Sequence, residues 1–183
     1  MHPANASAKE NFKSSKATEA DIDDLEKLVN LAYRGGKATV SWKNEDHLVE
    51  GPRIIKKDLQ DYLQSKDSSI LILRRTSNEI VGTVQVEKHG NDAHIGMLSV
   101  HPDFQNFGLG KQLLLLGEDC ARSEFSCSTA KMFVLAGREE LLAWYRKMGY
   151  ELTGETMPFF GPESGLKPKV ANAHFVVVAK NLK

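Results

Sequence analysis

Residues 105–111 place Gln105, Gly108, Gly110 and Lys111 directly before an apolar pattern with helical spacing. The backbone amides that open a helix lack intrahelical partners and carry the positive end of the helix macrodipole. The two glycines leave these amides open to a ligand, and the lysine adds a full positive charge. The segment therefore predicts a cradle for a phosphate or pyrophosphate group.

Two common phosphate-binding motifs do not fit this segment. A P-loop has Ser or Thr after its lysine, whereas Gln112 follows Lys111 here. The dinucleotide fingerprint needs a third glycine where this chain has Leu113. The pattern Gln-x-x-Gly-x-Gly after a strand ending at Val100 and Pro102 instead resembles the acetyl-CoA loop of the GNAT superfamily of N-acetyltransferases. The alternative is a strand-turn-helix unit whose glycines serve packing alone.

A second segment supports the resemblance. Residues 141–150 read Leu-x-x-Trp-Tyr-Arg-Lys-Met-Gly-Tyr, similar to the superfamily's helix ending in Tyr-x-x-x-Gly-aromatic. The resemblance extends over residues 12–182. It implies an α/β (α+β) GNAT fold with flanking helices and a central, mostly antiparallel mixed sheet, which a β-bulge splays into a V.

Apolar periodicity and turn residues locate the elements of this fold. Short turns between the strands at 69–74, 80–87 and 94–100 predict an antiparallel meander, and the helix that follows predicts a parallel βαβ unit. We expect the remaining strands at residues 12–17, 129–135, 150–156 and 174–179, and helices at 18–34, 52–65, 109–125 and 138–149.

Composition limits the class of protein. The 183 residues are 41% hydrophobic and 26% charged, which is typical of a soluble globular domain. Basic and acidic residues balance at 24 each, so we expect no nucleic-acid or membrane partner. Cys120 and Cys127 are too few for a disulfide framework and indicate a reducing, cytoplasmic location. We expect a flexible segment at residues 1–10 and a single N-acetyltransferase domain at 11–183.

The resemblance assigns a cofactor site without a metal. Acetyl-CoA would lie in the V, with the backbone of Leu98 and Val100 pairing with the pantetheine amides. Arg138 occupies a position where many family members have asparagine, and it would contact CoA or an acidic substrate group. The pyrophosphate would be held by the amides of Gln105, Asn106, Phe107, Gly108, Leu109, Gly110 and Lys111.

Acetyl transfer to an amine raises two proton problems. A lysine-like ammonium titrates near 10.4, so the free amine at pH 7 costs about 4–5 kcal/mol unless a base takes the proton. Tyr145 matches the family's acid that protonates the departing thiolate, although its spacing also suits a core tyrosine. His94 matches a position where some members place a base, but it also suits a strand-end histidine. His89, Glu87 or a chain of waters are the alternatives.

The connection at residues 35–50 and the excursion at 159–173 should form the substrate walls. From these and their flanks we select Arg34, Trp42, Glu155 and Phe160. Glu155 or Glu45 would pair with a cationic amine. We therefore expect an acetyl-CoA-dependent enzyme that acetylates a small-molecule or peptide amine by direct transfer. The sequence leaves the oligomeric state open, with a homodimer through the last strands as one option. The alternative is a catalytically silent CoA-sensing or protein-interaction module.

Overall fold

The computed structural model describes residues 11–35, 44–161 and 164–183. The first ten residues, which we expect to be flexible, lie outside this description. No described helix is both long enough and apolar enough to cross a membrane.

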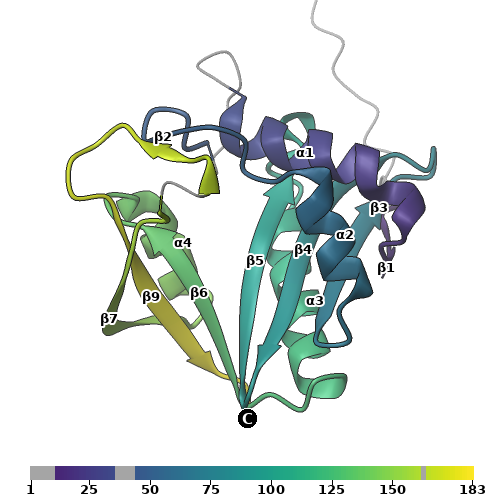
Figure 1. Cartoon of the computed structure of the whole chain (residues 1–183). Helices are drawn as coiled ribbons and strands as arrows, with labels where there is room; N and C mark the ends of the chain where they lie inside the picture. The colour runs from purple at the N-terminus through teal and green to yellow at the C-terminus, as the bar shows by residue number, and fades with distance from the viewer. Residues whose placement is uncertain (1–10, 36–43, 162–163) are drawn as a thin grey trace, which may run out of the picture.

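A seven-stranded sheet forms the centre of the molecule, in the order β1-β3-β4-β5-β6-β9-β7 (Figure 1). The β5–β6 pair is parallel, and the other described pairs of this sheet are antiparallel, as the meander and the βαβ unit predict. The strands are β1 Lys13–Lys16, β3 Ser68–Arg74, β4 Ile80–His89, β5 Asp92–Val100, β6 Thr129–Leu135, β7 Glu151–Pro158 and β9 His174–Asn181.

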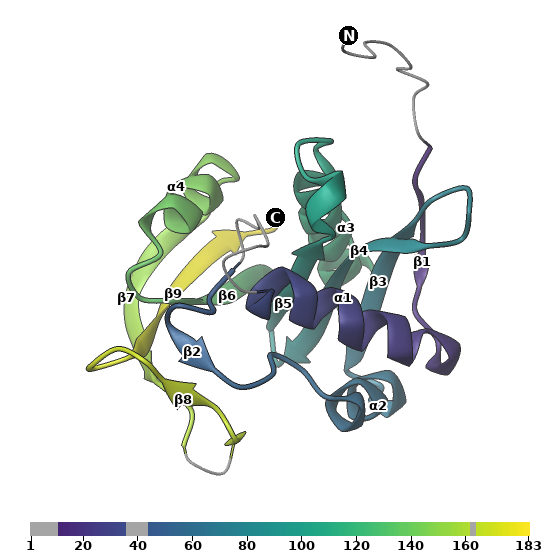
Figure 2. The same cartoon turned by 90° about the horizontal axis from the view of Figure 1, so that it is seen from above.

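Helices cover both faces of this sheet (Figure 2). The apolar stripe of α1 packs with α2 on one face in one buried cluster, and α3 packs on the opposite face in a second cluster. The helices are η1 Glu19–Asp21, α1 Ile22–Arg34, α2 Lys56–Gln64, η2 Pro102–Phe104, α3 Leu109–Ser123 and α4 Glu139–Lys147.

Local sequence signals explain several element ends. The Thr18 amide donates to the Asp21 carboxylate at 2.9 Å, which completes the capping box at the start of the first helical segment. The turn between β4 and β5 holds two residues, of which Gly90 has φ +63°. Both strands therefore run further toward this turn than apolar alternation alone predicts.

β5 and β6 separate into a V soon after they meet (Figure 1). Their described pairing runs from Asp92 opposite Thr129 to His94 opposite Lys131. Beyond that point each strand is paired only on its outer side, with β4 and β9 respectively. The splay that the sequence predicts is therefore confirmed.

A β-bulge accompanies the splay. The β4–β5 register shifts between Thr83 and Gln85, and on β5 Met97 adopts a left-handed φ of +50°. Ser99 is fully buried and donates its hydroxyl to the Met97 carbonyl at 3.0 Å. Its side chain thus stabilises the strand rather than facing the V.

A second, two-stranded sheet is not predicted from the sequence. β2, Val49–Glu50, pairs antiparallel with β8, Lys167–Pro168. Two-residue strands carry no periodic signal, so only the folded chain reveals them. This pairing joins the two segments that we expect to form the substrate walls, and it places them over one arm of the V (Figure 2).

Candidate active site

The glycine-containing loop opens onto a cavity of about 380 Å³ on the α3 side of the V. Asn106 and Gly108 both have left-handed backbones, with φ of +71° and +76°, and these turn the chain into α3. Within residues 11–35, 44–161 and 164–183, no acceptor is found for the first three amides of α3, those of Leu109, Gly110 and Lys111. These donors meet the needs of an anionic group at a helix N-terminus.

An unpartnered side-chain donor lies beside these amides. The Nε2 atom of Gln105 is buried and has no hydrogen-bond partner among the described residues. A buried donor without an acceptor is costly, so a ligand oxygen would relieve it. Lys111 lines the same cavity, whereas Phe107 packs against Phe12 and Phe104. The residues present therefore fit a phosphate-bearing cofactor.

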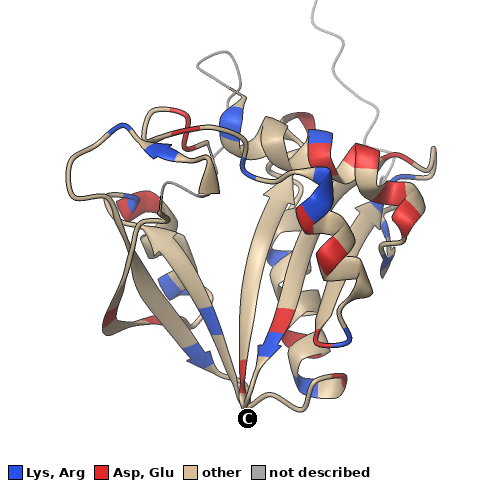
Figure 3. Cartoon of the chain, in the orientation of Figure 1, with Lys and Arg blue, Asp and Glu red and all other residues tan. Residues whose placement is uncertain are grey.

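A second cavity, of about 130 Å³, lies between the arms of the V on the side of β2 and β8. Its walls include β5 and β6 above their pairing, where neither strand carries a charged residue (Figure 3). Three aromatic rings form one wall: Phe159 stacks on Phe175 at 5.9 Å, and Phe160 tilts against Phe175 at 5.1 Å. This is an enclosed, largely apolar site.

The two cavities meet at the gap between the strands. Leu98 lines the second cavity and Val100 the first, two residues apart on one strand, while Leu141 lines both. On α4, Trp144 lines the first cavity and its neighbour Tyr145 lines the second. A ligand held at the glycine loop can therefore extend along β5 into the enclosed cavity.

Tyr145 is 2% exposed within this second cavity. Burial raises its pKa well above the usual value near 10, with the neighbouring phenols of Tyr33 and Tyr150 adding to the rise. The phenol therefore keeps its proton at neutral pH. A protonated hydroxyl in a dry cavity can donate a hydrogen bond or a proton to a developing anion.

Tyr33 lines the second cavity and is not predicted from the sequence as a site residue. Its hydroxyl donates to the Leu98 carbonyl oxygen at 3.4 Å, at the point of β5 where the two cavities meet. Its position one residue after the apolar Ala32 offers no hint of this contact. Tyr33 thus connects α1 to the strand that lines the V.

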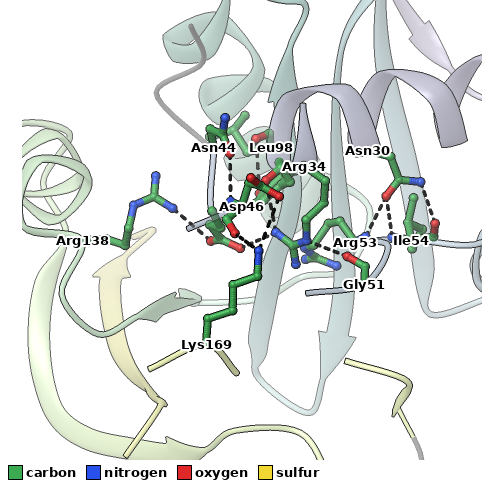
Figure 4. A network of polar contacts seen from close by, with 12 residues as sticks. Asn30, Arg34, Asn44, Asp46, Gly51, Arg53, Ile54, Leu98, Arg138 and Lys169 are labelled. Carbon is green, nitrogen blue, oxygen red and sulfur yellow. Dashed lines mark hydrogen bonds and ion pairs between the residues drawn. The ribbon is translucent and has the colours of Figure 1, made fainter. Parts of the chain in front are cut away.

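A polar cluster closes the second cavity (Figure 4). Glu45 is engaged through both oxygens: Arg34 lies 3.1 Å from one, and Arg138 lies 3.2 Å from the other. All three side chains are at most 13% exposed. Arg53 also lines the cavity, with its guanidinium carbon 5.1 Å from the centre of the Tyr33 ring.

A model of the acetyltransferase (GNAT) family matches residues 36–150. The chain belongs to this family. Acetyl transfer is therefore the general chemistry associated with its fold.

Individual GNAT proteins resemble the chain over most of its length. An uncharacterised N-acetyltransferase, ycf52, of Pyropia yezoensis is 26% identical over 80% of this chain and 84% of its own. The catalytic subunit NAA20 of the N-terminal acetyltransferase B complex of Arabidopsis thaliana is 22% identical over 84% and 77%. The PaiA N-acetyltransferase of Thermoplasma acidophilum, solved in complex with coenzyme A, has a TM-score of 0.67 and 15% identity, covering 93% of this chain and 99% of its own.

His94 lines neither the first nor the second cavity. It occupies the closed end of the V, where its ring stacks on His89 at 4.0 Å and meets the edge of Phe133 at 4.8 Å. Phe133 lines the second cavity, whereas His94 itself is not among the lining residues. Glu87 lies 3.5 Å from His89. The three base candidates thus gather near the vertex and not beside Tyr145.

The expected substrate residues separate in space. Arg34 and Phe160 line the second cavity, and Arg138 approaches it through Glu45. Glu155 lies on the exposed strand β7, with its carboxylate 4.0 Å from the Lys131 ammonium, and does not line the cavity. Trp42 lies outside the described residues.

The two cysteines and the described metal-ligand side chains are the other candidates for a reactive centre. Cys120 and Cys127 are buried free thiols, and burial raises the pKa of Cys120 to about 11, so its thiolate is scarce at neutral pH. Across residues 11–35, 44–161 and 164–183, no group of three or more His, Cys, Asp or Glu side chains is placed to hold a metal ion.

Proposed function

We propose that this protein transfers the acetyl group of acetyl-CoA directly to a primary amine of a small molecule or peptide, with residues 11–183 acting as one acetyltransferase domain. The observation that carries the proposal is the meeting of two cavities beside Leu98 and Val100. One cavity presents unpartnered amides and the Gln105 donor, and the other holds a buried tyrosine.

Residues of the first cavity hold the cofactor. The amides of Leu109, Gly110 and Lys111, with the Gln105 side chain, bind the pyrophosphate. The backbone of Leu98 and Val100, on the edge of β5 that faces the V, offers hydrogen bonds to an extended pantetheine arm. Acetyl-CoA supplies an activated thioester whose leaving group is a thiolate.

Tyr145 acts on that leaving group. Burial keeps its phenol protonated, so Tyr145 donates a hydrogen bond or its proton to the thiolate as the bond to the acyl carbon breaks. Burial raises the pKa of both cysteines, which supports attack by the amine itself over a covalent acetyl-enzyme.

The acceptor amine enters the second cavity as a free base. Glu45 is already bonded to two arginines, so it is poorly placed to neutralise a cationic amine. Phe133 lies between the His94 ring and the cavity. A chain of waters therefore carries the amine proton away.

Calorimetry followed by a turnover assay tests this function. Purified protein is titrated with acetyl-CoA, with dephospho-CoA and adenosine diphosphate as comparators. Binding that depends on the pantetheine arm, followed by amine-dependent thiol release, supports the enzyme. Binding without thiol release from any amine would favour a CoA-sensing module, and absence of binding would refute both readings.

The proposal extends to the compartment and the oligomeric state of the protein. The two free cysteines suit a reducing compartment, and we place the protein in the cytoplasm. A homodimer through β7 is supported by the exposure of this edge strand, with Leu152 51% and Met157 46% exposed. Light scattering of the wild type and of Leu152→Glu tests this: a dimer that the substitution converts to a monomer is the expected result.

A further inference from the structure

The charges around the second cavity do not balance. Among the residues that the structure describes, Arg34, Arg53 and Arg138 gather there with Glu45, which leaves two positive charges in excess (Figure 4). Lys169 and Asp46, at the rim, contribute one charge of each sign and lie 3.9 Å apart. An acceptor that carried a second ammonium group would be repelled from this site.

Arg53 differs from the other two arginines. Arg34 and Arg138 bind Glu45, whereas the guanidinium of Arg53 has no carboxylate or hydrogen-bond acceptor within the described chain. It is half-buried, lines the cavity and lies over the Tyr33 ring. Burial raises the pKa of Tyr33, and Arg53 is the charge that most opposes this rise, so its field reaches into the cavity.

A guanidinium in such a place is suited to one kind of ligand. Its five donors are fixed in a planar fork that matches a carboxylate through two parallel hydrogen bonds. Partial burial beside apolar walls strengthens that pairing relative to water. We propose that the acceptor is a small amine that also carries a carboxylate, and that Arg53 binds this carboxylate. This inference rests on the proposed acetyltransferase function.

The geometry also limits the distance between the amine and the carboxylate of the acceptor. Tyr33 contacts the Leu98 carbonyl through its hydroxyl and Arg53 through its ring, so one tyrosine side chain spans from the acetyl-transfer point to the anion site. The amine and the carboxylate are therefore separated by roughly one aromatic ring. The wall formed by Phe159, Phe160 and Phe175 suits an apolar spacer between them.

Matched ligands test the inference by calorimetry, with and without saturating CoA. The probes are 4-(aminomethyl)benzoate and 4-aminobutyrate, each beside its own carboxamide, which keeps the amine and removes the negative charge. We expect each acid to bind the wild type at least about tenfold more tightly than its amide, as one charge-assisted pair predicts.

Substitutions assign this preference to Arg53. Arg53→Gln should bring the acid and amide affinities together, and Arg53→Lys, which keeps the charge without the fork, should retain part of the difference. Arg122→Gln, on the exposed face of α3, should leave the preference unchanged. Thermal melts confirm that each variant is folded.

The outcomes separate this inference from the proposed function. Equal affinity of acid and amide, no binding of either, or a preference that survives Arg53→Gln overturns the carboxylate site. Acetyl-CoA binding and thiol release are measured on the same preparations. If amines are acetylated without regard to their carboxylate, only the inference falls; if acetyl-CoA does not bind, the proposed function falls, and the titrations without CoA still decide whether Arg53 binds the acid.

Discussion

His94 and Lys131 form the last paired position between β5 and β6, and the V opens immediately beyond them. The His94 ring at this hinge is held between His89 and Phe133. The Lys131 ammonium lies 2.9 Å from the Asp92 carboxylate. Titratable groups therefore surround the point from which the two arms of the V diverge.

Protonation of His94 should weaken the fold at this point. Burial lowers the pKa of His94, and His89 and Lys131 lower it further, while Glu87 and Asp92 oppose them. Because the unfolded chain binds this proton more readily, stability is greatest above about pH 6.5 and falls as pH drops through and below that value.

Urea unfolding between pH 5 and 8 measures the effect. The wild type should lose more stability on acidification than His94→Phe, which cannot take up the proton. His47→Asn, at an exposed histidine, should follow the wild type. Parallel curves for wild type and His94→Phe would show that His94 has no part in the pH dependence.

Tyr145→Phe should reduce turnover and spare the cofactor. The substitution keeps the ring in its buried position but removes the proton donor, so kcat should fall by about 10²–10⁴ while the Kd for acetyl-CoA changes by less than about twofold. Tyr150→Phe is the control, because its hydroxyl bonds Glu118 and does not line either cavity. An unchanged kcat for Tyr145→Phe would remove Tyr145 from the acid role.

The sequence anticipates the geometry of the glycine loop and of the helix that carries Tyr145, and their roles toward acetyl-CoA stay predictions. Residues 105–111 and this helix are contiguous segments, and their backbone geometry follows from the glycines and the spacing. The splay could also be anticipated, because it comes with the fold.

The acceptor side could not be predicted in the same way. Glu45 meets Arg34 and Arg138 close in sequence to β2, which pairs with β8, and neither two-residue strand has a periodic signal. Tyr33 and Arg53 come together through a ring contact between a helix end and a loop. Contacts of this kind depend on tertiary packing, which no local pattern in this chain encodes.

Glu118 should be a main determinant of stability. It is 2% exposed on α3, where it accepts from the Lys180 ammonium at 2.9 and 3.0 Å and from the Tyr150 hydroxyl at 3.1 Å. These bonds join α3 to β9 and to the residue that precedes β7, which lie on the other arm of the V. Glu118→Gln removes the charge that balances Lys180 and should lower the free energy of unfolding by about 3 kcal/mol.

The exposed pair of Glu124 with Lys16 is the comparison for Glu118. Its side chains are 37% and 59% exposed, so Glu124→Gln should cost less than about 1 kcal/mol in urea unfolding. Equal losses for the two variants would mean that the buried pair contributes no more than a surface pair, and that other contacts hold the two arms of the V together.

Gly108 and Gly90 allow the cofactor role of the glycine loop to be separated from backbone strain. Both have left-handed φ values, +76° and +63°, and at both a new Cβ would meet no atom within 4 Å. Valine at either position should therefore impose a similar strain of about 1–2 kcal/mol on the fold.

Only Gly108→Val should also affect acetyl-CoA, because only Gly108 precedes the unpartnered amides of α3. We expect calorimetry to give a Kd raised at least about tenfold for Gly108→Val and unchanged for Gly90→Val, with comparable losses in the urea midpoint. If both variants retain wild-type affinity, the amides are simply a solvated helix start. If both lose affinity equally, the loss reflects damage to the fold, and the cradle is no longer supported.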